Sequence, residues 1–393
     1  MALNLQAHRR WQQRQIQMHI TVAIPTFNRV EKLKKCLDSI TSQSLDSDIQ
    51  LSIAISNTAS SDGTYSYLSN LEGPDGRYFV TNKIGTDTHC NMGSLATTIP
   101  PHADWVWLMG DDDYLASPHS ISIIHEIINT TQTPDLSFVH ACQARRSTRS
   151  GNMYENEVLK LCEEFGYHEM LGWFSSIVTR KDIMTEALEN WQSRIQERQW
   201  EVSAFGHSAE MLKLLHDKQG AFVDYPLVEP QDDEMTAESV QRWMVENTAE
   251  RYFYVIDDLI EMREQRLFTD TLSSTFFRYH TYSLWDRLIS QQLSVLTNFK
   301  SISGETKRRA FLERFTANWD RIQKLCSMIK EPQIQKYLCM TLHHATHISG
   351  QFLNGEMSHS DFESAAHEQV SMFNAPVHSF NVAQHQDDLS SAA

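Results

Sequence analysis

Three consecutive aspartates (Asp111, Asp112 and Asp113) directly follow the strand-like apolar residues 105–110. Adjacent negative charges repel one another, most strongly where a buried strand limits access of water. Carboxylates at a strand end can converge on one hard cation, because Mg²⁺ and Mn²⁺ prefer oxygen ligands. We therefore expect Asp111, Asp112 and Asp113 to bind Mn²⁺ or Mg²⁺. The alternative is a solvated acidic turn, which Gly110 and the preceding buried strand make less favourable.

The elements that would position this triplet alternate between strand and helix. Residues 20–29 read as a strand stopped by Pro25, after which Asn28 and Glu31 give the capping-box pattern of a helix start. We expect further strands at residues 49–56, 77–82, 104–109, 136–140 and 171–180. This alternation predicts an α/β fold with a mostly parallel sheet flanked by helices. Ligands of such sheets bind beyond the carboxyl ends of the strands.

Composition excludes several classes of protein. The chain has 393 residues and a net charge of −16, which argues against nucleic acid as a partner. The six cysteines form no C-x-x-C pair and indicate reduced thiols of a cytoplasmic protein. No run approaches the roughly 18 apolar residues of a membrane span. Residues 1–18 lack the apolar core of a signal peptide and predict a flexible arm, with peripheral association at the inner face of the membrane as an option.

The second half of the chain has a different pattern. From about residue 237 apolar and aromatic residues recur at helical spacing, so we expect a C-terminal all-helical region at 237–374 after an α/β domain at 19–236. This region could close the acceptor side, mediate a homodimer or lie against a membrane. His343 and His347 have a spacing that can chelate a metal, but a solvated helix face is favoured. The polar residues 375–393 predict a flexible tail.

Four motifs together carry a family resemblance. "TVAIPTFNR", "ISNTASSDGT", "NKIGTDTHCNMG" and "WVWLMGDDDYL" occur in this order. Over residues 19–230 the chain thereby resembles the family 2 glycosyltransferases of GT-A fold, in particular a bacterial branch similar to the abequosyltransferases of O-antigen synthesis. The resemblance implies a nucleotide-sugar donor, a divalent metal and inversion at the anomeric carbon. It also implies a saccharide or lipid-linked saccharide acceptor.

The resemblance assigns roles to individual positions. The implied donor-binding residues are Pro25, Thr26, Asn28, Asn57, Asp62, Gly85, Asn91, Asp111 and Asp112, and the implied metal ligands are Asp111, Asp112 and Asp113. Two departures from the family pattern leave questions open. Asn57 and Thr58 stand where many relatives carry two aspartates, which leaves the nucleobase open. Gly110 stands where many have Asp, which leaves open which aspartate binds the metal.

An inverting transfer needs a base for the acceptor hydroxyl. The resemblance places it near residues 201–210, where His207 and Glu210 are spaced to share one helix face. Histidine ordinarily titrates near working pH, which favours His207, with Glu201 and the Asp232-Asp233 loop behind it. The family's usual acidic pair is missing, so a non-catalytic nucleotide-sugar-binding module is an alternative. A nucleotidyltransferase is a third option, but it would need a Gly- and Lys/Arg-rich loop after the first strand.

Overall fold

A computed structural model describes most of the chain. The described residues are 17–58, 60–71, 76–83, 90–131, 133, 135–198, 202–203, 205–230, 248–280, 285–297, 299 and 302–374. Outside them lie the expected tail, nearly all of the expected N-terminal arm, and Gly85, Glu201, Asp232 and Asp233. The chain divides into two compact units. One comprises residues 1–161, 168–200 and 210–233, and the other comprises 162–167, 201–209 and 234–393.

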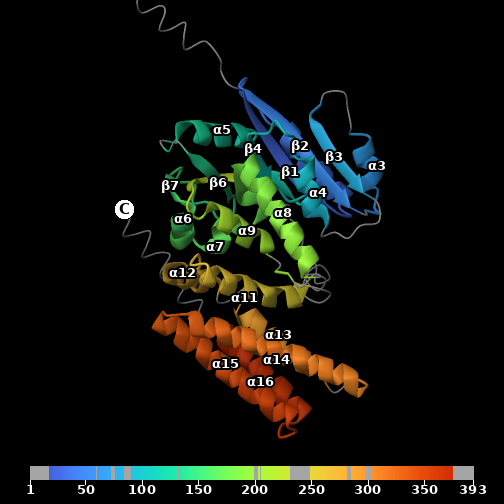
Figure 1. Cartoon of the computed structure of the whole chain (residues 1–393), viewed down its shortest axis with the longest axis vertical. Coiled ribbons are helices and arrows are strands. Elements are labelled where there is room, and N and C mark those ends of the chain that lie inside the picture. The colour runs from blue at the N-terminus through green and yellow to red at the C-terminus, as the bar shows by residue number, and fades with distance from the viewer. Residues whose placement is uncertain are drawn as a thin grey trace, which may run out of the picture. The chain divides into compact units, whose positions relative to one another are not determined.

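The first unit is built on one mixed β-sheet. Its strands are β1 (Met18–Thr26), β2 (Ile49–Thr58), β3 (Tyr78–Lys83), β4 (Trp105–Leu108), β5 (Asp113–Leu115), β6 (Leu136–Gln143), β7 (Met153–Glu157), β8 (Ile177–Arg180) and β9 (Gln219–Pro230). They are ordered β3-β2-β1-β4-β8-β6-β9-β5, with β7 paired to β9. Figure 1 labels the strands β1 to β4, β6 and β7 of this sheet. The strands β3, β2, β1 and β4 are parallel, whereas β8 is antiparallel to both β4 and β6.

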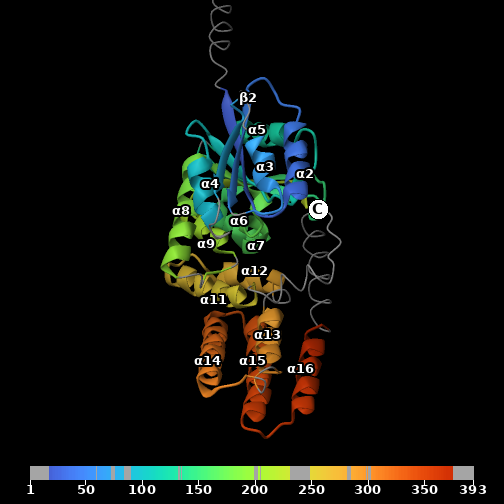
Figure 2. The same ribbon diagram turned by 90° about the vertical axis from the view of Figure 1, so that its right-hand side faces the viewer.

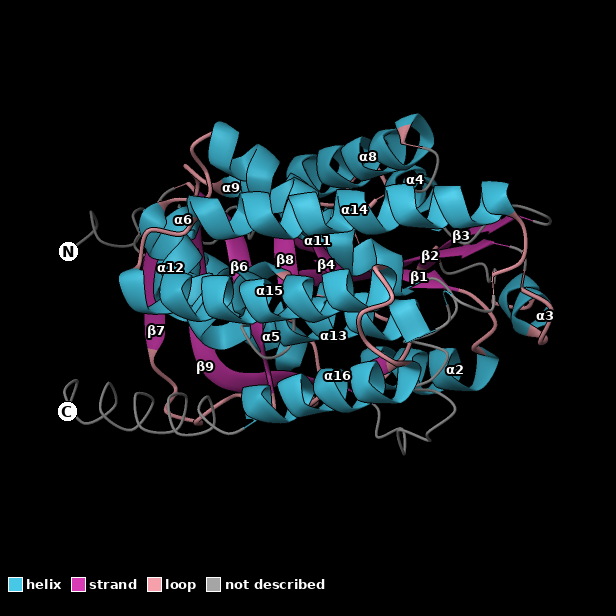
Figure 3. Cartoon of the chain, turned by 90° about the horizontal axis from the view of Figure 1, so that it is seen from below, coloured by secondary structure: helices cyan, strands magenta, loops and turns pink. Residues whose placement is uncertain are grey.

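Helices cover both faces of this sheet. The helical segments up to β9 are α2 (Val30–Thr41), α3 (Thr64–Ser69), α4 (Cys90–Thr98), α5 (Ser120–Thr130), α6 (Val158–Phe165), α7 (Tyr167–Leu171), the 3-10 turn η1 (Phe174–Ser176), α8 (Lys181–Glu197) and α9 (Gly206–Leu215). Figure 3 shows α4 and α8 on one face and α2 and α5 on the other. The central strands are buried on both sides, as the near-continuous apolar run Trp105–Leu108 requires. The α/β fold class with a helical C-terminal region is confirmed.

One expected strand is largely wrong. Of residues 171–180 only Ile177–Arg180 are strand, because α7 ends at Leu171 and a short 3-10 turn follows. The Gly172 N–H donates to the carbonyl of His168 at 2.9 Å, which ends the helix. A Cβ at Gly172 would lie 2.5 Å from that carbonyl oxygen, so the close approach requires glycine. An apolar run therefore marked burial here rather than an extended backbone.

The C-terminal part consists of helices, as expected. They are α11 (Thr248–Glu264), α12 (Asp270–His280), α13 (Asp286–Thr297), α14 (Glu305–Met328), α15 (Pro332–Leu353) and α16 (His359–Asn374). Figure 2 shows α14, α15 and α16 as neighbouring helices. The side chains of Phe276, Phe277, Trp285 and Leu288 are fully buried and form part of its core. Within the described part of the chain, none of the helices combines the length and apolarity that crossing a bilayer requires.

Candidate functional site

The carboxyl ends of four parallel strands bring the predicted polar residues to one edge of the sheet. Thr26 at the end of β1 is in register with Asn57 of β2. On its other side β1 pairs with β4, and the two strands are in register up to Ala23 and Leu108. Each segment then continues for three residues, to Thr26 after Ala23 and to Asp111 after Leu108. The Thr26 hydroxyl donates to Asp111 Oδ2 at 2.7 Å. Sequence segments about eighty residues apart thus meet at one point.

The three aspartates of the triplet have different surroundings. Asp111 is 4% exposed, whereas the Asp112 side chain is 39% exposed. Asp113 is buried at the start of β5, where its carboxylate accepts a short hydrogen bond from the Ser175 hydroxyl. Ser175 Oγ in turn accepts the Gly110 N–H at 2.9 Å. The structure therefore gives Asp113 an internal partner and leaves Asp112 as the accessible carboxylate.

The cation beside the triplet is an arginine of the chain itself. Arg29 Nη1 lies 2.9 Å from Asp111 Oδ1 and 2.8 Å from Asp112 Oδ2. One guanidinium nitrogen thus bridges two carboxylates. Because Asp111 is buried, this charge-assisted pair offsets part of its desolvation.

Burial and crowding of like charges shift the acidity of this cluster. Burial raises the pKa of Asp111, although the nearby Arg29 opposes the rise. Burial also raises the pKa of Asp113 to about 7, against the hydrogen bond from Ser175. The Cys36 thiol, whose Sγ lies 3.7 Å from the Gly110 carbonyl oxygen, has its pKa raised by burial and by Asp111. A further positive charge at this edge would therefore be stabilised.

Gly110 fits the crowding around the triplet. A Cβ at this position would lie 2.9 Å from Asp113 Oδ2 and 3.0 Å from Asp112 Oδ1. Glycine thus leaves space for carboxylates that an additional side chain would displace.

The loop after β1 is joined to the loop after β2. Asn28 has a left-handed backbone (φ 52°), and its Oδ1 accepts the Ser61 N–H at 2.7 Å. Asp62 Oδ2 accepts the N–H of Val30, the first residue of α2, at 2.9 Å. The expected capping of this helix by Asn28 and Glu31 is wrong, because the N-cap residue is Arg29 and the capping carboxylate comes from Asp62 in the next loop.

The Asp62 carboxylate is also used within its own loop. Its Oδ1 accepts the Thr64 N–H at 3.1 Å and the Thr64 hydroxyl at 2.6 Å. Burial acts to raise the pKa of Asp62, but the bonds from Thr64 and Val30 outweigh it and lower the pKa. Asp62 therefore fixes the geometry of both loops.

Two of the three expected asparagines, Asn57 and Asn91, are buried and hydrogen-bonded to neighbouring elements. Asn91 on α4 donates to the Thr26 carbonyl at 2.8 Å, and its Oδ1 accepts the Ser56 hydroxyl at 2.6 Å. Asn57 donates to Asn82 Oδ1 at 2.7 Å. These bonds hold the ends of β1, β2 and β3 together under the loops.

The two expected base residues lie on α9 and are both buried. Glu210 Oε1 is 2.8 Å from Arg194 Nη1 and 3.0 Å from Lys213 Nζ, so its carboxylate accepts bonds from two cations. His207 Nε2 lies 3.2 Å from Ser208 Oγ, and His207 as a residue is 3% exposed. The Glu210 carboxylate is thus held in a buried ion pair.

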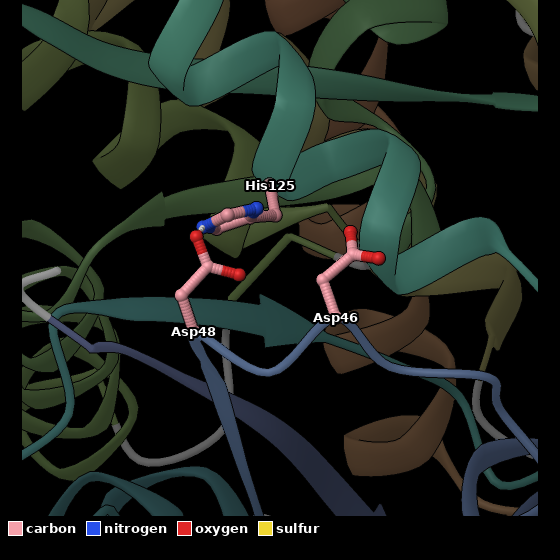
Figure 4. Close-up of side chains that lie close together, drawn as sticks. All are labelled: Asp46, Asp48 and His125. Atoms are coloured by element: carbon pink, nitrogen blue, oxygen red, sulfur yellow. Dashed lines mark ion pairs between the residues drawn. The ribbon is translucent and has the colours of Figure 1, made fainter.

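A second group of potential ligands was not expected. Asp46, Asp48 and His125 place one ligand atom each within 4.8 Å of one another (Figure 4). His125 Nε2 is 3.6 Å from Asp48 Oδ2 and 2.9 Å from Asn129 Nδ2, so the imidazole already has polar neighbours within the protein. Asp46 and Asp48 lie just before β2, at the amino end of the strand whose carboxyl end carries Asn57, and His125 lies on α5. In the part of the chain that is described, neither the triplet nor His343 and His347 forms such a group.

Sequence reasoning missed Arg29 and Ser175. Arg29 directly follows the expected donor residue Asn28, and its charge beside three carboxylates could have been inferred once β1 and β4 were taken as neighbours. Ser175 had no signal, because it stands in a 3-10 turn where a strand was expected.

Residues 21–172 match the family model described as glycosyl transferase family 2. A curated relative, abequosyltransferase RfbV of Salmonella typhimurium, is 28% identical over 113 residues, which is 29% of this chain and 33% of the relative. The match thus spans about a third of the length of that relative.

Two similar solved structures are complexes with a nucleotide sugar. TarS of S. aureus with UDP-GlcNAc has a TM-score of 0.49 and 11% identity over 84% of this chain and 88% of that chain. The mannosyltransferase PcManGT from Pyrobaculum calidifontis with GDP-Man and Mn²⁺ has a TM-score of 0.45 and 11% identity over 86% and 92%. The chain thus matches glycosyl transferase family 2 over residues 21–172, and over 113 residues it is similar to a bacterial abequosyltransferase.

Proposed function

We propose that the chain is a metal-dependent inverting glycosyltransferase that moves a sugar from a nucleotide-sugar donor to a saccharide or lipid-linked saccharide of a cell-surface polysaccharide. The observation that carries this proposal is the position of Asp111 and Asp112 at the carboxyl ends of the parallel strands, inside the matched segment 21–172. Donors of α/β sheets bind at this edge. The curated relative is named an abequosyltransferase, which supports the transfer of a sugar.

The chemistry of the triplet suits Mn²⁺ or Mg²⁺. Asp111 and Asp112 offer oxygen ligands, and the exposed Asp112 leaves room for water and diphosphate oxygens. Asp113, whose carboxylate accepts a hydrogen bond from Ser175, would contribute its negative charge from the buried side of the site. When bound, such a cation would neutralise the charge that develops on the departing diphosphate.

The remaining roles follow the strand ends. Pro25, Thr26, Asn28, Asn57 and Asp62 would shape the donor pocket, largely through their backbone, because the bonds among these loops already use the amide and carboxylate groups. Asn91 would hold the first loop from α4, and Gly85 would line the same pocket. Residues 19–236 would form the catalytic domain and 237–374 a helical domain.

For the base we propose His207 ahead of Glu210. A base must accept the proton of the acceptor hydroxyl. The Glu210 carboxylate already accepts bonds from Arg194 and Lys213, so its pairing would compete with this task. His207→Ala should lower turnover by about 10²-fold or more while the dissociation constant of the donor changes little. Normal turnover in both His207→Ala and Glu210→Ala would place the base elsewhere.

The central experiment tests metal and donor together. Purified protein is assayed with Mn²⁺ against a panel of nucleotide sugars, and Asp112→Asn is compared with Asp104→Asn. The Asp104→Asn substitution removes the same charge at the opposite end of β4, where the Asp104 carboxylate accepts the His19 N–H. We expect Asp112→Asn alone to lose metal-dependent donor binding. Equal behaviour of the two variants would contradict the proposal.

A non-catalytic nucleotide-sugar-binding module is the second candidate. The observation in its favour is the ion-paired state of Glu210, which leaves no exposed acidic base on α9 among the described residues. Donor binding without any turnover, in the presence of a range of saccharide acceptors, would support the module. A cytoplasmic location with peripheral association at the inner membrane face, and a homodimer through the helical region, extend the proposal from the sequence alone.

A further inference from the structure

Arg29 contacts two carboxylate oxygens that a divalent cation bound to the triplet would also use. Its Nη1 lies 2.9 Å from Asp111 Oδ1 and 2.8 Å from Asp112 Oδ2. A divalent cation binds carboxylate oxygens at about 2.1 Å. The two positive groups would then share the same oxygens and repel each other. Cation binding to these oxygens therefore requires the arginine side chain to move.

The Arg29 side chain is partly exposed at the start of α2. Its side chain is 40% exposed, and its backbone is fixed separately at the N-cap of α2. The first N–H of that helix is capped by Asp62 and so does not depend on the Arg29 side chain. Asp111, by contrast, is buried and retains its bond from the Thr26 hydroxyl when the arginine leaves.

A diphosphate offers the displaced side chain a partner. Guanidinium groups bind phosphate oxygens through charge-assisted and often bidentate hydrogen bonds. We propose that Arg29 is the resting counter-cation of Asp111 and Asp112, and that it leaves them for the donor diphosphate when the site fills. Divalent-cation binding is thereby coupled to nucleotide binding through one side chain. This inference rests on the proposed function, whose metal and donor sites it links.

The consequence is a restriction on the empty site. Without nucleotide, Arg29 competes with the cation, so the two aspartates bind Mn²⁺ weakly. With nucleotide, Arg29 contributes to the diphosphate instead and the competition ends. Removal of the guanidinium should therefore strengthen cation binding and weaken nucleotide binding at the same time. A merely structural role for Arg29 would weaken both or neither.

The test measures binding rather than turnover. Mn²⁺ binding to nucleotide-free protein is followed by electron paramagnetic resonance of free Mn²⁺. Binding of UDP, GDP, CDP and ADP, each in turn, is followed by calorimetry in a metal-free buffer. Arg29→Gln is compared with Lys34→Gln, which removes the same charge from α2. Lys34 pairs with Glu31 at 2.7 Å and lies over the Tyr67 ring, away from the triplet.

We expect Arg29→Gln to bind Mn²⁺ about tenfold more tightly than wild type. It should bind the preferred nucleotide about tenfold more weakly, because roughly one charge-assisted contact to the diphosphate is lost. Lys34→Gln should match wild type in both. Arg29→Lys keeps the charge without the planar fork and should fall between wild type and Arg29→Gln. It also serves as the informative variant if Arg29→Gln folds poorly.

The outcomes separate the inference from the function on which it rests. If wild type binds Mn²⁺ and nucleotide through Asp112 but Arg29→Gln behaves like Lys34→Gln, the role of Arg29 is refuted and the proposed function stands. Weaker Mn²⁺ binding in Arg29→Gln would also refute it. If wild type with Mn²⁺ binds no nucleotide and Arg29→Gln gains no Mn²⁺ binding, both fail together.

Discussion

Asp224 on β9 anchors the loop between β6 and β7, and this predicts a specific acid sensitivity. Its carboxylate accepts hydrogen bonds from the Ser147 hydroxyl at 2.8 Å, the Thr148 N–H at 2.8 Å and the Ser150 hydroxyl at 2.7 Å. A further short bond comes from the Thr148 hydroxyl. Because these donors favour the charged form, protonation of Asp224 should loosen the whole loop.

The size of the effect follows from the acidity of the group. Burial acts to raise the pKa of Asp224, but the bonds from Thr148, Ser150 and Ser147 outweigh it and bring the pKa from 3.8 to about 2. A group with a lowered folded pKa stabilises the fold above its unfolded pKa and loses that contribution as pH falls through the folded value. The full contribution is about 2 kcal/mol. Roughly half of it should be lost at about pH 3.

The assay is urea unfolding followed by tryptophan fluorescence at pH 6 and at acid pH. Asp224→Asn should lower the free energy of unfolding by about 2 kcal/mol at pH 6 and by less at pH 3. Asp217→Asn is the matched control, since Asp217 lies just before β9 with a side chain 62% exposed. The reasoning is refuted if the two variants unfold alike at pH 6, or if the deficit of Asp224→Asn grows as pH falls.

Three further predictions concern other parts of the fold. Glu210→Gln should lower the free energy of unfolding by about 3 kcal/mol or more, because it leaves the buried Arg194 guanidinium without its carboxylate; an unchanged melting temperature would contradict this. Gly220→Ala should cost about 1–3 kcal/mol in urea unfolding, because the added Cβ would lie 2.8 Å from a core methyl group, and a neutral result would show that the core yields there. Treatment with a low-molecular-weight disulfide should oxidise Cys326 and Cys339 to an internal disulfide, because their Sγ atoms are 2.9 Å apart. Peptide mapping that finds another cysteine pair first would be the contrary result.

The parts of the fold that were predictable depend on local patterns. Residues 49–56 read as a strand from their apolar run, and β2 is Ile49–Thr58. The acidic triplet was recognised because a buried strand leads directly into it. In both cases residues adjacent in sequence carry the signal, since side-chain periodicity and run length are local properties.

The parts that were not predictable depend on which strands are neighbours. The bridge from Arg29 to Asp111 exists because β1 and β4 lie side by side, although more than eighty residues separate the two side chains. The start of α2 was assigned to a local capping box, but Asp62 reached it from another loop. No local pattern distinguishes an internal cap from one supplied by a distant carboxylate.

Asn28 Oδ1 accepts the Ser61 N–H, and Asp62 Oδ2 accepts the Val30 N–H. These hydrogen bonds couple the conformations of the loops after β1 and β2. A change of donor preference introduced in one loop would therefore be transmitted to the other. Anyone who transplants nucleotide selectivity from a relative should move residues 26–30 and 57–64 as one cassette. Within a lineage, substitutions in these two stretches should arise as compensating pairs, and recombination between them should yield inactive hybrids more often than recombination at β6.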